Sequence, residues 1–107
     1  MRRFIPVALF GLAGCITGPE SKPVAVLEVS ATTGRVPFTA TFNASKSHWT
    51  GESEGNYYDW YAGEGPAFAG GPVVQYTYVK VGQYKACVTF GVVEHADRAC
   101  VIITALP

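Results

Sequence analysis

Short runs in which apolar and polar residues alternate fill the chain from Val24 to Ala105, with turn residues between them. Residues 38–42 show the pattern clearly, since two phenylalanines and an alanine alternate with two threonines. A period of two sends successive side chains to opposite faces of a strand, and one apolar face indicates a half-buried sheet. No stretch of useful length has the helical period. The pattern therefore predicts an all-β protein with antiparallel strands.

Breaks in the alternation divide this region into about seven strands. The predicted strands cover residues 24–29, 38–42, 57–61, a short edge around 67–68, 74–78, 83–90 and 98–105. Residues 46–56 are rich in Ser, Gly and Glu and are predicted to be a loop, and residues 91–97 are predicted to join the last two strands. About seven short strands at this spacing predict a sandwich of two sheets.

The last two strands can be aligned by their side chains. If residue i faces residue 187 − i, Cys87 meets Cys100, while neighbouring pairs such as Val88 with Ala99 are apolar and lie on the opposite face. This register predicts a cross-strand disulfide on the outer face of the hairpin. The bond would close a loop of about 14 residues, for which chain entropy gives about 3 kcal/mol of stabilisation.

The N-terminal residues have a different character. Two arginines precede an apolar run at 4–12 that is too short to span a bilayer, an arrangement typical of a secretory signal. The small pair Ala13-Gly14 before Cys15 resembles the lipobox of bacterial lipoproteins. That resemblance implies removal of residues 1–14, acylation of Cys15 (palmitate among the acyl groups), and a membrane partner reached through lipid. An ordinary signal peptide with an incidental cysteine is the alternative.

The cysteine count agrees with export. Three cysteines are an odd number for an exported protein, and assigning Cys15 to lipid leaves Cys87 and Cys100 as a pair suited to an oxidising compartment. Zinc is not expected at the pair, because no Cys-x-x-Cys or histidine stands at ligand spacing. Residue 16 is isoleucine rather than aspartate. Under the sorting rule of Gram-negative lipoproteins, the expected location is the outer membrane or cell surface.

Length and charge limit the number of domains and the kinds of partner that are expected. Loss of residues 1–14 from the 107-residue chain leaves 93, enough for one compact domain. That remainder has six basic and eight acidic residues, so nucleic acid is not an expected partner. No second apolar run approaches the ~20 residues of a spanning helix. The predicted organisation is a signal peptide at 1–14, a lipidated cysteine with a polar tether at 15–23, and a sandwich domain at 24–107.

Four stretches within residues 24–105 resemble the PKD (polycystic-kidney-disease) domain. Val36–Ser45 is similar to the Pro-x-x-Val-x-Phe-Asp-Ala-Ser strand of that family. Tyr58–Gly65 stands where the family has Tyr-x-Trp-Asp-Phe-Gly-Asp-Gly, Tyr76–Tyr78 resembles His-Thr-Tyr, and Gly82–Val88 resembles Gly-x-Tyr-x-Val-x-Leu. The resemblance implies an immunoglobulin-like β-sandwich of about seven antiparallel strands, a fold common on extracellular and surface proteins.

The central motif departs from the family at acidic positions. Tyr61, Ala62 and Glu64 replace the family's Asp, Phe and Asp, and in some relatives such an acidic cluster is associated with calcium. Loss of the first acid argues against calcium, and we predict no metal. Trp60 is predicted to fill the core between the sheets, and Tyr84 to be a hydrogen-bonded corner tyrosine.

Catalytic chemistry is not expected. The sequence lacks Gly-x-Ser-x-Gly, His-Glu-x-x-His and any glycine-rich loop before a helix. Asp59 and Glu64 are the nearest pair of acids, but glycosidase carboxylates work across a deep sugar cleft that a small sandwich has little material to build. We predict no catalytic residue, no cofactor and no enzymatic activity.

Two polar loops are expected at the same end of the sandwich. They gather His48, Trp49, Glu52, Glu54, Glu94, His95 and Asp97. Three interpretations stay open: a divalent-metal site, a sugar-binding site where Trp49 stacks on a ring, or two solvated loops with Trp49 folded over the end of the core. The candidate residues of this loop-end site are His48, Trp49, Glu94 and His95.

The outer face of the sheet that holds the last hairpin is the second candidate surface. Tyr57, Tyr61 and Ile102 are predicted to point outward there beside the disulfide, flanked by Lys85, Thr89 and Thr104. Exposed aromatic residues on a flat sheet are typical of protein contacts. Scattered apolar residues are also normal on protein surfaces, which is the alternative interpretation.

These observations predict a non-catalytic, lipid-anchored surface module. Its expected partner is another envelope or surface protein in an envelope, adhesion or secretion assembly, bound through the outer face. The alternative partner is a glycan, either another carbohydrate or peptidoglycan, bound through Trp49 and its loop neighbours.

Overall fold

The structure is a computed structural model that describes residues 20–107. The predicted signal peptide at 1–14 and the lipidated Cys15 lie outside the described residues. No helix within 20–107 has the length and apolar character needed to cross a bilayer.

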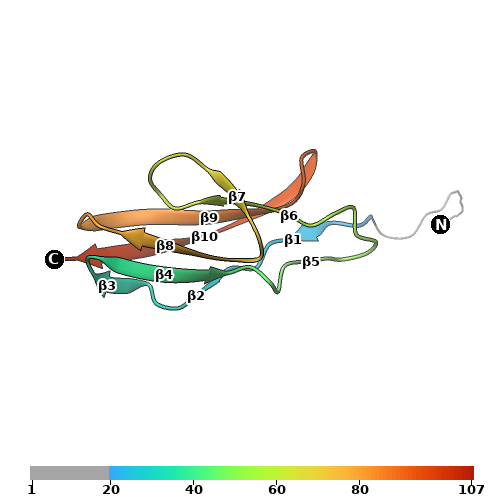
Figure 1. Cartoon of the computed structure of the whole chain (residues 1–107). Helices are drawn as coiled ribbons and strands as arrows, with labels where there is room; N and C mark the ends of the chain where they lie inside the picture. Colours follow the sequence, from blue (N-terminus) through green and yellow to red (C-terminus); the bar gives the residue numbers. More distant parts are fainter. Residues whose placement is uncertain (1–19) are drawn as a thin grey trace, which may run out of the picture.

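All the elements within the described residues are strands. They are β1 (Pro23–Val24), β2 (Glu28–Val29), β3 (Thr33–Arg35), β4 (Phe38–Asn43), β5 (His48–Trp49), β6 (Tyr57–Tyr61), β7 (Phe68–Gly70), β8 (Val73–Tyr78), β9 (Gly82–Val92) and β10 (His95–Leu106). A five-stranded sheet in the order β3-β10-β9-β6-β7 faces a three-stranded sheet in the order β2-β4-β8, and β1 pairs with β5 at one end (Figure 1). The predicted all-β sandwich is confirmed.

The core fills the space between the two larger sheets. Its largest fully buried side chains are Tyr78, Phe90, Ile103 and Val88. Trp60 of β6 is 3% exposed and packs against Phe42 of β4 in the opposite sheet, with ring centroids 6.2 Å apart. The indole Nε1 of Trp60 donates to the Gly71 carbonyl at 3.0 Å, which satisfies its polar group. Trp60 therefore joins the two layers.

The β9–β10 hairpin has the predicted register. Cys87 lies opposite Cys100 and the two are bonded, while Val88 lies opposite Ala99 on the inner face. The predicted loop at 91–97 is wrong in extent, since only two residues separate the strands. Gly91 explains the difference: its φ is +135°, and a Cβ there would collide with the His95 carbonyl oxygen, so glycine lets the two strands continue close together.

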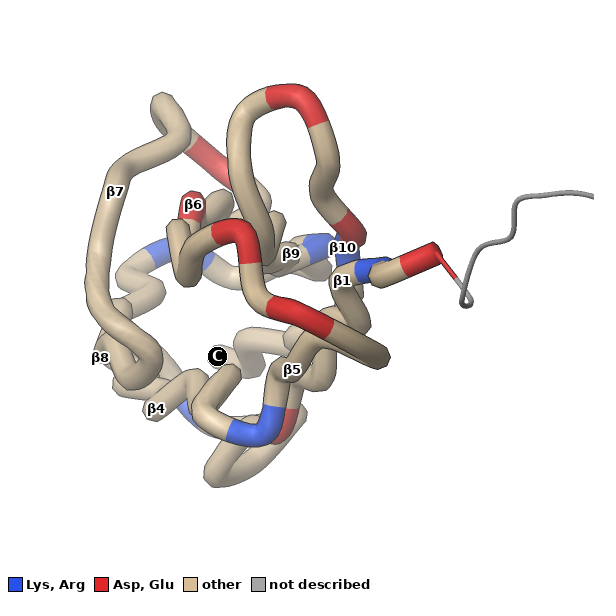
Figure 2. Tube along the Cα trace, turned by 90° about the vertical axis from the view of Figure 1, so that its right-hand side faces the viewer, with Lys and Arg blue, Asp and Glu red and all other residues tan. Residues whose placement is uncertain are grey.

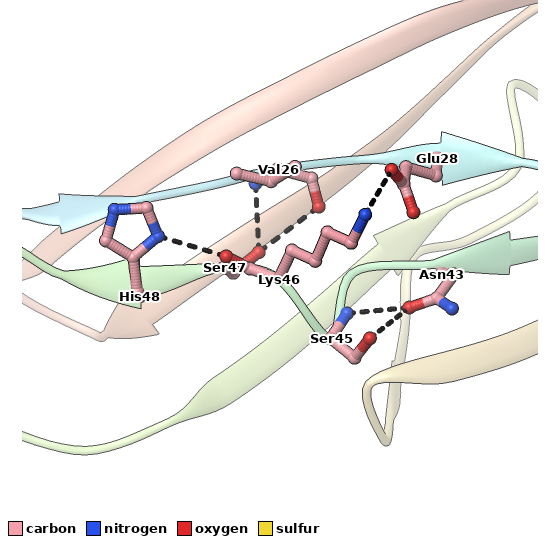
Figure 3. A network of polar contacts seen from close by, with 7 residues as sticks. All are labelled: Val26, Glu28, Asn43, Ser45, Lys46, Ser47 and His48. Atoms are coloured by element: carbon pink, nitrogen blue, oxygen red, sulfur yellow. Dashed lines mark hydrogen bonds and ion pairs between the residues drawn. The ribbon is translucent and has the colours of Figure 1, made fainter.

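The predicted strand at 24–29 is also wrong as a single strand. It divides into β1 and β2, which belong to different sheets. Between them, the Ser47 hydroxyl accepts from the Val26 amide at 2.9 Å and contacts the Val26 carbonyl oxygen at 3.3 Å (Figure 3). Lys46 pairs with Glu28 at 3.1 Å beside it. The serine side chain replaces a strand partner, and this allows the chain to cross between sheets.

Two short strands were not predicted. β3 pairs in parallel with the end of β10, with Thr33 opposite Thr104. β5 lies inside the segment predicted to be a loop, where Trp49 pairs with Pro23 of β1. Neither strand has an alternating pattern of its own, so the sequence does not predict it. Each is held in place by pairing with a neighbouring strand.

The folded domain begins earlier than the predicted boundary at residue 24. The Lys22 amide donates to the Thr50 hydroxyl at 3.0 Å, and the Thr50 amide donates to the Lys22 carbonyl at 2.9 Å. The Ser21 hydroxyl donates to the Glu52 carbonyl at 2.7 Å. Residues 21–23 therefore belong to the domain rather than to a free tether.

Candidate functional site

The outer face of the five-stranded sheet carries two adjacent rows of side chains. In one row, Asp59 of β6 lies opposite Thr89 of β9, which lies opposite Arg98 of β10. In the next row, Tyr61 lies opposite Cys87, which is bonded to Cys100. Both rows point away from the core, because the residues between them in each strand, such as Trp60, point inward.

These rows line a hollow of about 330 Å³ on the outer face. Its lining residues are Asp59, Trp60, Tyr61, Ala67, Cys87, Thr89 and Arg98. Cys87 is only 2% exposed although it faces outward, whereas Cys100 is exposed. The disulfide thus forms part of a floor that is sheltered on the β6 side.

The connection between β6 and β7 shelters that side. It stands above the layer of β6 and β9 in Figure 1 and brings Ala67 to the rim of the hollow. It starts at Gly63, whose φ is +95° and whose position for a Cβ lies 2.9 Å from the Lys85 amide nitrogen. Only glycine lets the chain pass this close to β9.

The charged side chains of the hollow have no ionic partner. Asp59 is half-buried and Arg98 is exposed, and neither belongs to an ion pair among residues 20–107. Their strands are two interstrand spacings apart, about 10 Å, with Thr89 between them. A carboxylate, a hydroxyl and a guanidinium are therefore available to a bound molecule, beside the Tyr61 ring.

The predicted outer-face residues do not form one patch. Tyr57 is 48% exposed and Ile102 is 50% exposed, whereas Tyr61 is half-buried at the hollow. Tyr57 lies opposite Gly91 and Ile102 lies opposite Lys85, six residues apart along β9, or about 20 Å. The hollow with Tyr61 occupies the space between these two exposed residues. Thr104, predicted to flank the surface, lies beyond Ile102, opposite Gln83.

At the loop end, Trp49 is held by the protein itself. Its ring packs against Phe90 and His95, with centroids 6.3 Å and 5.4 Å away, and its Nε1 donates to the Gly55 carbonyl at 3.0 Å. The side chain is half-buried. These contacts correspond to the interpretation of Trp49 as a cover over the end of the core.

The remaining loop-end residues are only partly brought together. His95 Nδ1 lies 3.5 Å from a Glu54 carboxylate oxygen, but His48 Nδ1 contacts the Lys46 carbonyl, and Glu94 stands exposed at the hairpin tip. Asp97 accepts from the Ala25 amide at 2.8 Å. Within residues 20–107, no three acidic, histidine or cysteine side chains are grouped so that they would hold a metal ion.

Glu64 does not take part in the hollow. Its carboxylate accepts from the Tyr76 hydroxyl at 2.8 Å, and this hydrogen bond is the main reason that the pKa of Tyr76 is raised. The neighbouring Tyr78 donates to the Ala62 carbonyl at 2.7 Å, and its burial raises the Tyr78 pKa strongly. Tyr84 donates to the Lys80 carbonyl at 2.6 Å, which holds the adjacent turn. This tyrosine cluster is structural.

Sequence reasoning missed Arg98 as a site residue and considered Asp59 only as a possible acid catalyst. The signal was present in the register that pairs residue i with residue 187 − i, since it places Arg98 opposite Thr89 on the face of the cysteines. The hollow itself had no such signal, because it depends on the course of the β6–β7 connection.

Comparison with known proteins supports the fold. A solved structure described as showing the structural basis for the promiscuous specificity of the carbohydrate-binding modules from the β-sandwich superfamily matches 79% of this chain, with a TM-score of 0.69 and 22% sequence identity. The fold is a β-sandwich. The chain spans 34% of the length of that matched chain. No family model matches the sequence, and no curated protein matches it.

Proposed function

We propose that this protein is a non-catalytic module that binds carbohydrate in the hollow on the outer face of the five-stranded sheet. The observation that carries the proposal is the juxtaposition of the Tyr61 ring with the polar groups of Asp59, Thr89 and Arg98 around one concave site. The proposal moves the carbohydrate site from Trp49 and the loop end to the sheet face.

The chemistry of these groups suits a sugar. A pyranose has C–H groups that pack on apolar or aromatic surface and hydroxyls that both donate and accept hydrogen bonds. The Tyr61 ring and the disulfide supply apolar surface, Asp59 accepts, Arg98 donates, and Thr89 does both. A few convergent polar groups in a concave, partly apolar site are the usual composition of a small-molecule site.

The site is also held in place before the ligand arrives. Asp59, Thr89 and Arg98 stand on three adjacent strands, and the disulfide links two of these strands one row away. Binding then has to order only the side chains of these residues, because their backbones are already fixed in the sheet. The structural match to a carbohydrate-binding module supports the same class of ligand, since that module shares the sandwich fold.

The proposal also covers the domain family and the membrane attachment of the protein. We propose that the sandwich is a PKD-like domain, on the basis of the four motifs within residues 24–105. We further propose that Cys15 carries lipid and that the domain is displayed at the outer membrane or cell surface, on the basis of the lipobox-like Ala13-Gly14-Cys15.

A protein of the cell envelope is the second candidate partner. The exposure of Tyr57 and Ile102 favours it, because both are large side chains that are about half exposed on the same face. Their separation along β9 makes them suited to a broad partner that contacts the two ends of the face, whereas a sugar would occupy the hollow between them.

Affinity electrophoresis of the full-length protein in detergent, through gels that contain a panel of neutral and acidic polysaccharides, tests the proposal. We expect retardation by at least one polymer. Tyr61→Ala should weaken it about tenfold or more, which corresponds to about 1.4 kcal/mol of binding energy. Tyr57→Ala is the matched control, because Tyr57 is an aromatic residue on the same strand and face but does not line the hollow.

Each other outcome has a definite meaning. If no polysaccharide retards the wild-type protein, carbohydrate binding is wrong and the envelope protein becomes the favoured partner. If the two tyrosine variants lose retardation equally, the ligand does not sit in the hollow. Thermal unfolding of both variants confirms that the sandwich is intact.

A further inference from the structure

We infer that the sugar held in the hollow is a hexuronic acid residue of an acidic polysaccharide, an inference that rests on the proposed carbohydrate function. The observation behind it is the placement of an unpaired guanidinium, Arg98, and an unpaired carboxylate, Asp59, on opposite sides of Thr89.

The two charges divide the hollow into an anion-binding side and a hydroxyl-binding side. Arg98 presents a planar fork of N–H donors that matches a carboxylate with two parallel hydrogen bonds. Asp59 is acceptor-only when ionised, so it binds hydroxyl groups and repels a carboxylate. A hexuronic acid has its carboxylate on one side of the ring and hydroxyls on the other, and this is the same division.

The two charged groups stand on strands that are not neighbours in the sheet. Their strands are separated by β9, about 10 Å in total, and no ion pair joins them among the described residues. An arginine without an ionic partner gains more from an anionic ligand than from a neutral one, because charge-assisted hydrogen bonds are about twice as strong as neutral ones. A neutral sugar would leave this gain unused.

A second cation extends the site along β9. Lys85 is exposed on the same face, has no ionic partner within residues 20–107, and lies four residues from Thr89, or about 13 Å along the strand. Tyr61 and the disulfide lie between the two cations. A chain with repeated carboxylates can therefore contact Arg98 in the hollow and Lys85 beyond it.

The charges at the loop end determine in which direction the bound polymer continues from the hollow. Acidic residues gather at the end of the molecule that faces the viewer in Figure 2. Glu52 and Glu54 lie between β5 and β6, Glu94 lies at the hairpin tip, and Asp97 lies near the start of β10. An anionic chain that continued from the hollow toward these loops would be repelled. It therefore continues in the other direction, past the disulfide toward Lys85.

The test compares polymers that differ only in their carboxylates. Full-length protein in detergent is run through gels that contain polygalacturonate, alginate or hyaluronan, and through gels with the carboxyl-reduced form of each, in which every carboxylate has become a primary alcohol. We expect retardation by at least one uronic polymer at 0.15 M salt and at least about tenfold weaker retardation by its reduced form, equivalent to about 1.4 kcal/mol.

Variants separate specific contact from general attraction. Arg98→Gln should remove the preference for the uronic polymer over its reduced form, and Lys85→Gln should reduce that preference in part. Lys80→Gln is the matched control: it makes the same change in net charge at an exposed lysine that does not line the hollow, and retardation should be unchanged.

Four results would overturn the inference. Equal retardation by a uronic polymer and its reduced form would show a neutral ligand and leave the proposed function standing, as would retardation by neutral polysaccharides alone. Equal losses in Arg98→Gln and Lys80→Gln would show non-specific charge attraction. Absence of retardation by every neutral and acidic polymer would remove the proposed function together with the inference.

Discussion

At the scale of single residues, the two tryptophans have similar structural roles at different depths. Trp60 lies between the sheets and donates to Gly71, and Trp49 covers the end of the core and donates to Gly55. Each indole has an apolar body against the core and one satisfied N–H group, so each contributes to the stability of the fold. Of the two aromatic residues that line the hollow, Trp60 points into the core and Tyr61 lies on the outer face.

This assignment predicts the effect of removing Trp49. Trp49→Ala should lower the free energy of unfolding by about 2 kcal/mol, less than the 3–5 kcal/mol typical of fully buried aromatic residues, because Trp49 is only half-buried. Polysaccharide retardation, measured well below the melting temperature, should be unchanged. Denaturant unfolding and affinity electrophoresis of the same preparation give both quantities.

Trp49→Phe serves as the control for this prediction. It keeps an aromatic ring against Phe90 but loses the hydrogen bond to Gly55, which should cost about 1 kcal/mol. A Trp49→Ala variant with wild-type stability and abolished retardation would contradict the assignment and return the carbohydrate site to the loop end.

At the scale of elements, the β9–β10 hairpin organises both the fold and the site. It contributes the centre of the five-stranded sheet, the buried Val88 and Ile103 on one face, and Thr89 and Arg98 on the other. Its disulfide joins the two strands in the row beside the charged pair. The stability of the fold and the proposed ligand site therefore depend on the same element.

Removal of the disulfide should affect both properties. Replacing Cys87 and Cys100 together with serine should lower the free energy of unfolding by about 2–4 kcal/mol, because the unfolded chain is no longer cross-linked. The same change should weaken polysaccharide retardation, since Cys87 forms part of the floor of the hollow. Urea unfolding with and without reductant measures the first effect in wild-type and variant protein.

The comparison between reductant and mutation provides the check. Reduced wild-type protein should unfold at nearly the same urea concentration as the double variant, and reductant should leave the variant unchanged. An identical midpoint for oxidised wild type and double variant would show that the bond does not stabilise the domain.

The elements also show what the sequence can predict. The strands β4, β6 and β8 and the β9–β10 hairpin each bury one face, so their alternation of apolar and polar residues predicted that they exist, although the two hairpin strands extend further toward their turn than predicted. The sequence predicts one strand where the structure has β1 and β2. The separation of these two strands depends on the Ser47 hydroxyl, which lies far along the chain. β3 exists only as an addition to β10, and no local pattern signals such pairing.

The candidate site was predictable to the same extent. The face was predictable, because strand parity places Tyr61, Asp59 and Arg98 on the side of the disulfide. The hollow was not, because it requires the path of the β6–β7 connection over β9, which depends on the close approach at Gly63. Conformations of glycine-rich connections depend on what they pack against, and a period of two says nothing about them.

At the scale of the whole molecule, the predicted lipid anchor would determine how the proposed ligand site lies relative to the membrane. Mass spectrometry of membrane-extracted protein should show a chain that begins at an acylated Cys15, because the small pair Ala13-Gly14 precedes it in a lipobox-like sequence. A Cys15→Ala variant, as control, should retain residues 1–14. Recovery of a soluble mature wild-type form with a free thiol at Cys15 would refute lipidation.

The hydrogen bonds that attach Ser21 and Lys22 to the loop near Thr50 have a consequence for how such an anchored domain would stand. Only six backbone steps separate Cys15 from Ser21, which together reach at most about 21 Å. An anchor at Cys15 would therefore keep the acidic loop end beside the lipid headgroups and point the long strands away from the bilayer. A polysaccharide that runs from Arg98 toward Lys85 would then be bound with its axis along the membrane normal rather than parallel to the membrane surface.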